Sequence, residues 1–378
     1  MMKPEKTKYY SWKNGNLAKG CQLCVQGRKL VLFVTGLCSR KCYYCPISDA
    51  KKDLDVVYAN EWRLKDEDDF DALIKEAKLT DAKGAGITGG DPLVRIERTV
   101  KYIKLLKKKF GKSFHIHLYT LPELVTEDAL MKLNKAGLDE IRLHPDIENK
   151  KHWWKIELLK RFSWDVGVEI PAVPGMEKET VRLINYFKDD VDFLNINELE
   201  VSDTNAYELL KKGFMPKDKV SYGVKGSQEM ALSLLKRYAD ENVEMHYCTT
   251  TLKDRVQLSN RIKIRAKNVK KPFDEMTKEG MLIRGAVYLP ELAPGFGYRK
   301  KLEEVKKDRF IKQLEDIKKD LQKKYRIPSK MIIVDREKPR ILTSKKFAAR
   351  IKKDKELRTA IVTEYPTWDQ TEIDVKFI

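Results

Sequence analysis

The stretch Leu30-Val-Leu-Phe-Val-Thr-Gly-Leu-Cys38-Ser-Arg-Lys-Cys42-Tyr-Tyr-Cys45-Pro46 decides the fold that we predict for this chain. Its first residues form an apolar run, which is typical of a buried strand in a parallel sheet. The cysteines that follow are spaced C-x3-C-x2-C, so three thiols share one short loop. Such a loop can wrap one corner of an iron–sulfur cluster and leave one iron without a protein ligand. A structural zinc site with a fourth ligand from elsewhere is the alternative.

The cysteines are concentrated near the start of the chain. Five of the six lie between Cys21 and Cys45. The segment from Met1 to Lys8 is polar and lacks the apolar core of a secretion signal, and no apolar run approaches the roughly 18 residues of a membrane span. We therefore expect a cytoplasmic protein with no membrane partner, in which clustered cysteines bind metal rather than form disulfides.

The composition is that of a folded protein with an uneven charge. The 378 residues are 42% hydrophobic and 35% charged, which predicts a soluble globule of two or three domains and excludes a small disulfide scaffold or a disordered polyelectrolyte. The net charge is +19. Residues 251–378 hold 34 Lys and Arg against 19 Asp and Glu, so the basic excess belongs to the last third.

Short apolar segments alternate with helix-periodic segments after the cysteine loop. Strands are predicted near 29–35, 84–88, 113–120, 138–144, 165–171, 191–198 and 243–249. Helices are predicted near 62–78, 94–110, 122–136, 148–163, 177–188 and 226–241. This alternation predicts an α/β fold built from parallel βαβ units with right-handed crossovers.

The predicted strands carry polar residues at alternate positions. Apolar residues of each strand should face the covering helices, so the residues between them should face the interior of the sheet. These are His115, His117, Tyr119, Arg142, His144, Glu169, Asn195, Asn197, Glu244, His246 and Cys248. So many inward polar groups indicate a lumen that binds a ligand, and the alternative is that each is a satisfied polar group of the core.

A second motif follows the strand near 84–88. In Thr88-Gly89-Gly90-Asp91-Pro92, the two glycines allow the backbone to approach a ligand closely. A carboxylate at the carboxyl end of the strand can accept hydrogen bonds from an ammonium group. A plain turn is the alternative interpretation.

Together these residues resemble the radical S-adenosylmethionine (SAM) superfamily, and in particular archaeal-type proteins related to pyruvate formate-lyase activating enzyme. The resemblance covers about residues 28–250 and rests on C-x3-C-x-aromatic-C, with Tyr44 before the last cysteine, and on Gly89-Gly90-Asp91, where the family more often has Glu at the third position. It implies a partial (β/α) TIM-type barrel in which Cys38, Cys42 and Cys45 hold a [4Fe-4S] cluster whose open iron binds SAM.

The resemblance also implies roles for other residues. Tyr44, Gly89, Gly90 and Asp91 would contact SAM, as would Glu169, Asn195 and Asn197 by their positions alone. The candidate catalytic residues in the lumen are His117, Tyr119, Arg142 and His144. Reductive cleavage of SAM would give a 5′-deoxyadenosyl radical that abstracts hydrogen from a substrate, with ferredoxin or flavodoxin as an electron donor.

The remaining cysteines suggest a second site. Cys21-Gln-Leu-Cys24 precedes the first strand, and His246-Tyr-Cys248 ends the last. These four residues could form a Cys3His site for zinc or for an auxiliary iron–sulfur cluster. Buried, unreactive cysteines are the alternative.

The last third predicts a nucleic-acid partner. From Thr251 to Lys271 the sequence predicts a basic helix, whose candidate RNA-binding residues are Lys253, Arg255, Arg261, Lys263, Arg265 and Lys267. A solvated basic face is the alternative. Beyond it, strands near 281–289, 331–335, 340–343, 359–364 and 371–377 and helices near 298–324 and 344–355 predict a smaller ferredoxin-like α+β module.

These observations divide the chain into an N-terminal extension (1–27), a radical SAM barrel (28–272) and a basic C-terminal domain (273–378). We expect a radical SAM enzyme that modifies RNA, with tRNA as the substrate. One alternative is a radical activase or modifier of a protein, peptide or small molecule. The other is a zinc-stabilised RNA-binding protein without radical chemistry. The sequence does not predict an oligomeric state.

Overall fold

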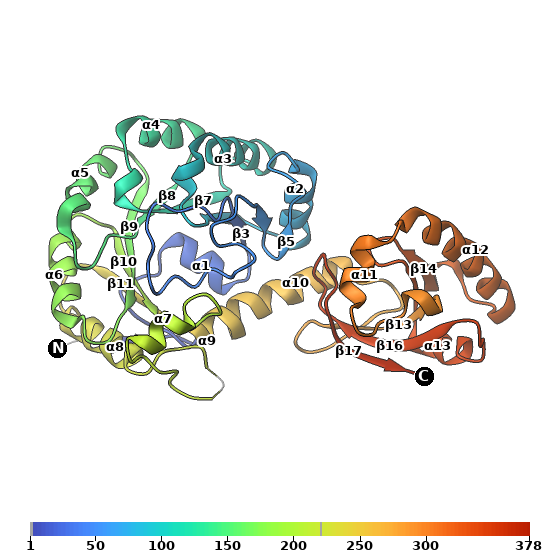
Figure 1. Cartoon of the computed structure of the whole chain (residues 1–378). Coiled ribbons are helices and arrows are strands. Elements are labelled where there is room, and N and C mark those ends of the chain that lie inside the picture. The colour runs from blue at the N-terminus through green and yellow to red at the C-terminus, as the bar shows by residue number, and fades with distance from the viewer. Residues whose placement is uncertain (1–2, 220) are drawn as a thin grey trace. The chain divides into compact units, whose positions relative to one another are not determined.

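The computed structural model describes residues 3–219 and 221–378, which fold into two compact units (Figure 1). The first unit ends at Arg261 and the second begins at Ile262. This boundary lies inside helix α10 (Ser259–Val269), and the domain boundary after residue 272 stays a prediction. Within the described residues, no helix is long and apolar enough to cross a membrane.

Seven parallel strands form the centre of the first unit. They are, in spatial order, β3 (Lys29–Phe33), β6 (Gly84–Thr88), β7 (His115–Thr120), β8 (Glu140–Leu143), β9 (Asp165–Ala172), β10 (Phe193–Glu198) and β11 (Glu244–Cys248). Each pairs in parallel with the next. The sheet curves into an open barrel (Figure 1), which confirms the predicted strands and the α/β class.

Short antiparallel strands extend both edges of this sheet. β4 (Tyr58–Ala59) and β5 (Trp62–Arg63) follow β3 at one edge. At the other edge β2 (Trp12–Asn14) pairs with β11, and β1 (Glu5–Lys6) pairs with β2. The N-terminal residues that the sequence sets apart as an extension are therefore part of the barrel sheet.

Helices cover the outer face of the barrel (Figure 1). They are α2 (Phe70–Leu79), α3 (Ile96–Phe110), α4 (Glu127–Ala136), α5 (Ile156–Leu159), α6 (Glu177–Phe187) and α8 (Ser227–Arg237). The predicted helix near 148–163 begins as a 3-10 turn (Lys150–Lys155), and α4 is preceded by a separate 3-10 turn (Pro122–Leu124). Ile87, Leu118 and Ile141 are fully buried beneath these helices, as the alternation predicts.

A short helix that the sequence analysis missed lies inside the curve of the barrel. This helix, α1 (Lys19–Val25), packs against β3, β6 and β7 (Figure 1). The backbone N–H of Gly20 donates to Glu140 Oε2 at 3.1 Å. Seven residues with a glycine, two cysteines and no side-chain N-cap give little helical signal, so tertiary packing forms this helix. It fills the amino-terminal part of the lumen.

Gly20 allows α1 to approach the strands, and this predicts a stability effect. A Cβ at Gly20 would lie 2.6 Å from His117 Nδ1 and 2.7 Å from Arg142 Nη2. We expect Gly20→Ala to lower the free energy of unfolding by about 1–3 kcal/mol through overpacking. Gly295→Ala is the control, because nothing lies within 4 Å of a Cβ there. Equal stability of the two variants in denaturant titrations would contradict this close packing.

The second unit is an antiparallel sheet covered by helices. Its strands are β12 (Glu275–Met276), β13 (Leu282–Tyr288), β14 (Ile332–Asp335), β15 (Arg340–Thr343), β16 (Arg358–Glu364) and β17 (Glu372–Phe377). The sheet order is β14-β15-β13-β16-β17, and β12 pairs with β13. With helices after β13 and β15, this is a βαββαβ arrangement with two added strands, β12 and β17. The predicted helix near 298–324 is two helices, α11 (Tyr298–Glu304) and α12 (Lys307–Tyr325), because Val305 is extended, and α13 (Lys345–Ile351) follows β15.

Candidate functional site

The cysteine loop follows β3 at the carboxyl ends of the parallel strands. Cys38, Cys42 and Cys45 are free, half-buried and line a cavity of about 560 Å³. Burial raises the pKa of Cys38 to about 11, and the neighbouring Cys42 and Cys45 add to the rise because like charges would repel. The three thiols therefore converge on one cavity.

The backbone around this loop is fixed by side chains from distant parts of the chain. Asn205 Nδ2 donates to Tyr44 O at 3.1 Å, and Thr204 Oγ1 donates to Ile47 O at 2.6 Å. The Tyr44 hydroxyl is 3.1 Å from His144 Nε2. Because irregular backbone needs partners for its polar groups, these contacts give the cysteines a defined arrangement before any ligand binds.

The glycines of the second motif allow it to pack against the cysteine loop. A Cβ at Gly89 would lie 2.4 Å from Thr35 O, and one at Gly90 would lie 2.3 Å from Leu37 O. The Gly90 N–H donates to Thr35 O at 2.8 Å. The two motifs therefore form one wall of the cavity, and only residues without a side chain fit at this contact.

The Asp91 carboxylate is fully buried and already has protein partners. It accepts from the backbone N–H of Leu93 at 2.9 Å and of Leu121 at 2.8 Å, and from the Thr120 hydroxyl at 3.0 Å. Burial raises the pKa of Asp91 to about 6, although these hydrogen bonds oppose the rise. The carboxylate thus fastens the end of β6 to the end of β7, while a contact with SAM stays a prediction.

The Glu169 carboxylate lines the cavity. Burial raises its pKa, but Arg142, Asn195 and Asn197 outweigh burial and hold the pKa at about 2. Arg142 Nη1 lies 2.8 Å from Glu169 Oε2, Asn195 Nδ2 lies 3.0 Å from the same oxygen, and Asn197 Nδ2 lies 2.9 Å from Oε1. The sequence predicts this trio of Glu and two Asn, and the structure brings its members together.

The four candidate catalytic residues lie at two levels of the lumen. Tyr119 and His144 line the cavity, whereas His117 and Arg142 lie below it towards α1. Arg142 contacts the cavity residues Glu169 and Tyr119, and its other partners are Glu140 and Cys21. Their catalytic roles stay predictions.

Lys29 is a cavity residue that the sequence analysis missed. It is 8% exposed at the start of β3 and lines the cavity. Burial lowers the pKa of Lys29, but Cys24 and Tyr119 outweigh burial and raise it. The sequence could have indicated this position, because Lys29 directly precedes the apolar run Leu30–Val34. The alternation of side chains along the strand turns the Lys29 side chain inward.

The residues of the predicted second site lie close together around α1. Cys21 Sγ accepts from Arg142 Nη2 at 3.5 Å, and Cys21 also contacts His246. Burial raises the pKa of Cys21, but Arg142 and His246 lower it to about 7. Cys24 packs beside Cys248. Among the described residues, however, no three of these donor atoms lie within 4.8 Å of one another, so the Cys3His site stays a prediction.

The six candidate RNA-binding residues are not all exposed, which differs from what the sequence analysis predicts for a basic helix. Lys253 lines the cavity and lies 3.1 Å from Glu200, and Arg261 is buried and paired with Glu61. Arg265 is only 4% exposed. Half of the six candidate RNA-binding cations are thus turned inward, while Arg255, Lys263 and Lys267 are at least partly exposed. The sequence could not reveal this, because the anions that pair with Lys253 and Arg261 lie far away in the chain.

Comparison with known proteins decides the family. The model of the radical SAM superfamily matches residues 32–189. Over 287 residues the chain is 48% identical to a Methanocaldococcus jannaschii protein, in an alignment that covers 74% of this chain and 75% of that protein. The chain belongs to the radical SAM superfamily. The relative's name proposes it as a glycyl-radical enzyme activating enzyme.

Solved radical SAM structures are more distant. SuiB from Streptococcus suis, bound to its precursor peptide SuiA, has a TM-score of 0.42 at 13% identity, covering 65% of this chain and 58% of SuiB. Methylornithine synthase (PylB) has a TM-score of 0.40 at 14% identity, covering 58% of this chain and 67% of PylB.

Membership in the superfamily makes this chain an enzyme that uses a [4Fe-4S] cluster and SAM. The residues present fit both groups. Three free thiols converge on the cavity from one loop, and three local cysteines leave one iron open. The cavity volume of about 560 Å³ is within the usual range for a small-molecule site.

Proposed function

We propose that this radical SAM enzyme is an activase that removes a hydrogen atom from a polypeptide. A reduced cluster held by Cys38, Cys42 and Cys45 would supply the electron for reductive cleavage of SAM into methionine and a 5′-deoxyadenosyl group that would take a hydrogen atom from the substrate. The main support for this proposal is that positive and negative charges balance along the cavity wall. The name of the Methanocaldococcus jannaschii relative supports the same class of enzyme, an activase. Both favour the activase alternative over RNA modification.

The charges that line the cavity offset one another. Five cations line it, namely Lys29, Arg40, Lys41, Lys52 and Lys253. Five carboxylates line it as well, namely Asp53, Asp91, Glu169, Glu198 and Glu200. A site for polyphosphate needs an excess of positive charge to replace counterions. A balanced wall suits a neutral peptide backbone better.

The residues of the cavity have separate roles in this proposal. Cys38, Cys42 and Cys45 hold the cluster, and the glycine motif lets the backbone approach SAM. Ionised Glu169 accepts hydrogen bonds from polar groups of SAM while Arg142 keeps it charged. His144 positions Tyr44, and Tyr44 is fixed in turn on the cysteine loop.

An apolar surface beside the cysteine loop offers a place for a protein partner. The segment that follows β10 is described at residues 201–219 and 221–224 and includes α7 (Ala206–Lys211). Four of its large apolar side chains are exposed, namely Tyr207, Leu210, Met215 and Tyr222. Lys212 Nζ lies 4.6 Å from the Tyr43 ring centre, which links this segment to the cysteine loop. Exposed aromatic residues and methionine are enriched at protein interfaces.

Transfer of deuterium tests the proposed substrate class. Reconstituted enzyme, SAM and reductant are mixed with protein extract from host cells grown on α-deuterated glycine, and 5′-deoxyadenosine is analysed by mass spectrometry. We expect deuterium in the product, lost after protease treatment of the extract and retained after ribonuclease treatment. Sensitivity to ribonuclease would restore the RNA hypothesis, and absence of deuterium would refute hydrogen removal from glycine.

A charge on the apolar surface should uncouple substrate use from SAM cleavage. Leu210→Asp places a carboxylate in the proposed interface, where its desolvation opposes docking. We expect deuterium transfer to fall by a factor of about 10–100, the range for losing one buried apolar anchor, while substrate-free SAM cleavage is unchanged. Met131→Asp on α4 is the control, because Met131 is also exposed but lies outside this segment. Equal transfer by both variants would show that the surface is not used.

A further inference from the structure

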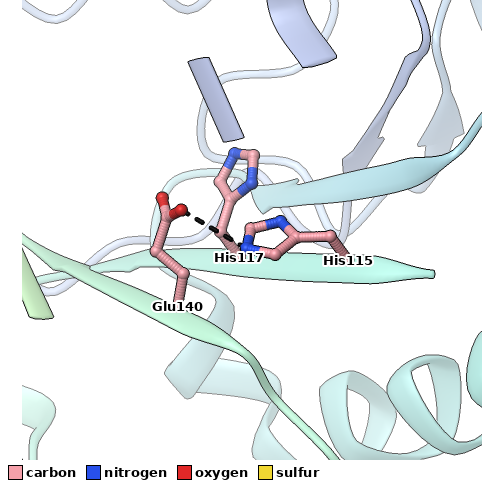
Figure 2. A group of neighbouring side chains, drawn as sticks. All are labelled: His115, His117 and Glu140. Carbon is pink, nitrogen blue, oxygen red and sulfur yellow. Dashed lines mark ion pairs between the residues drawn. The ribbon is translucent and has the colours of Figure 1, made fainter. Parts of the chain in front are cut away.

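A second group of possible metal ligands lies at the opposite end of the barrel from the cysteine loop. His115 and His117 come from β7, and Glu140 comes from the start of β8 (Figure 2). One ligand atom of each lies within 4.8 Å of those of the other two. His117 and Glu140 are register partners on adjacent parallel strands, so the sheet itself fixes their spacing.

Within the part of the chain that the structure describes, the two imidazoles have no hydrogen-bond partner, although His115 lies at ion-pair distance from Glu140. Both ring nitrogens of His117 and both of His115 are buried and unpartnered among the described residues. His117 is fully buried, and His115 Nε2 lies 3.4 Å from Glu140 Oε2. Leaving a buried polar group unpaired costs about 1–3 kcal/mol, so a folded chain rarely keeps four such nitrogens in one place. Water or a bound ion can satisfy them.

Glycine backbone packs closely against the His117 ring. A Cβ at Gly20 would lie 2.6 Å from Nδ1, and a Cβ at Gly86 would lie 2.6 Å from Nε2. Both nitrogens therefore face backbone that carries no side chain.

The charges around this group are compatible with a cation. Arg142 pairs with Glu140 Oε1. The other oxygen, Oε2, accepts a hydrogen bond from the Gly20 N–H and also faces His115. Further carboxylates gather at this end, since Asp165 interacts with Asp139, Asp192, Glu140 and Glu244. They offset Arg142 and the nearby Lys29 and Lys107.

We propose that His115, His117 and Glu140 bind one divalent transition-metal ion, Zn²⁺ or Fe²⁺, at the amino-terminal end of the barrel. Two imidazoles and one carboxylate are a ligand set that both ions accept. The ion would fasten β7 to β8, and through the Gly20 contact to Glu140 it would also hold α1 in the lumen. Its role is structural, because none of these three side chains is among the described residues that line the SAM cavity. The site is independent of the proposed substrate.

Metal counting on the anaerobic holoenzyme tests the site. The protein is incubated with Zn²⁺ or with Fe²⁺ and desalted, and zinc, iron and acid-labile sulfide are measured per chain. After incubation with Zn²⁺ we expect one zinc ion per chain. After incubation with Fe²⁺ we expect one more iron than sulfide per chain, because the cluster contains iron and sulfide in equal numbers. The variants His115→Ala and His117→Ala should lose this ion. His152→Ala should keep it, since His152 lies in the 3-10 turn Lys150–Lys155 outside the site.

A cysteine variant separates this site from the thiols near α1. Cys24→Ser should retain the ion, and its loss in that variant alone would place the metal on the cysteines and overturn the proposal. His115→Ala is the variant less prone to misfolding, because the His115 side chain is 11% exposed. No bound ion in the parent protein, or the same content in both histidine variants, would mean that water satisfies the imidazoles.

Discussion

Replacing Arg142 with methionine should lower the free energy of unfolding by about 3–5 kcal/mol, because it leaves buried anions without their cation. Arg142 is only 2% exposed, and its guanidinium contacts both Glu140 and Glu169. Methionine keeps much of the volume but supplies no charge. Without Arg142, burial should raise the pKa of Glu169, so the pH profile of SAM cleavage should shift upwards. Denaturant titration and the pH profile measure the two effects.

The control for this variant is an exposed ion pair of the same type. Arg161 pairs with Glu127, and both side chains are more than half exposed. Arg161→Met should change the free energy of unfolding by less than about 1 kcal/mol, as is usual for surface pairs. If Arg142→Met lowered the free energy of unfolding no more than Arg161→Met does, the stability of the polar lumen would not depend on Arg142. An unshifted pH profile would remove the positioning role of Arg142 towards Glu169.

Cys42→Ala should reduce SAM cleavage to the background level, because two thiolates on the loop cannot replace three in holding a cubane cluster. Cys42 lies between the other two ligands in the sequence, and its thiol faces the same cavity. Iron content and 5′-deoxyadenosine should fall together. Ser39→Ala, at an exposed position of the same loop, should leave both unchanged. Retained cleavage in Cys42→Ala would mean that other cysteines hold the cluster.

The barrel could be predicted from the sequence because its signals are local. An alternation of apolar and polar residues with a period of two places His144, Glu169 and Asn197 in the lumen, and the structure agrees. The cysteine loop and the Gly89-Gly90 turn are equally local, since each follows directly from a strand end. These features depend on neighbouring residues in the chain, which is the range over which sequence patterns are informative.

The features that sequence analysis missed depend on contacts between distant segments. Helix α1 is stabilised by the strands around it, not by its own residues. Lys253 was predicted to face RNA, but Glu200 turns it into the cavity. The grouping of His115 and His117 with Glu140 follows from the register of β7 and β8. A row of basic residues on a helix cannot reveal which of them find buried partners elsewhere.

The most direct test of this account is the yield of 5′-deoxyadenosine from the anaerobically reconstituted protein. We predict about four iron atoms and four sulfides per cluster on the loop, as a [4Fe-4S] centre requires. On addition of dithionite and SAM, we predict formation of methionine and 5′-deoxyadenosine in equal amounts. A protein that binds iron and sulfide at this stoichiometry but forms no 5′-deoxyadenosine, or that binds neither, would contradict the central claim that this cavity cleaves SAM reductively.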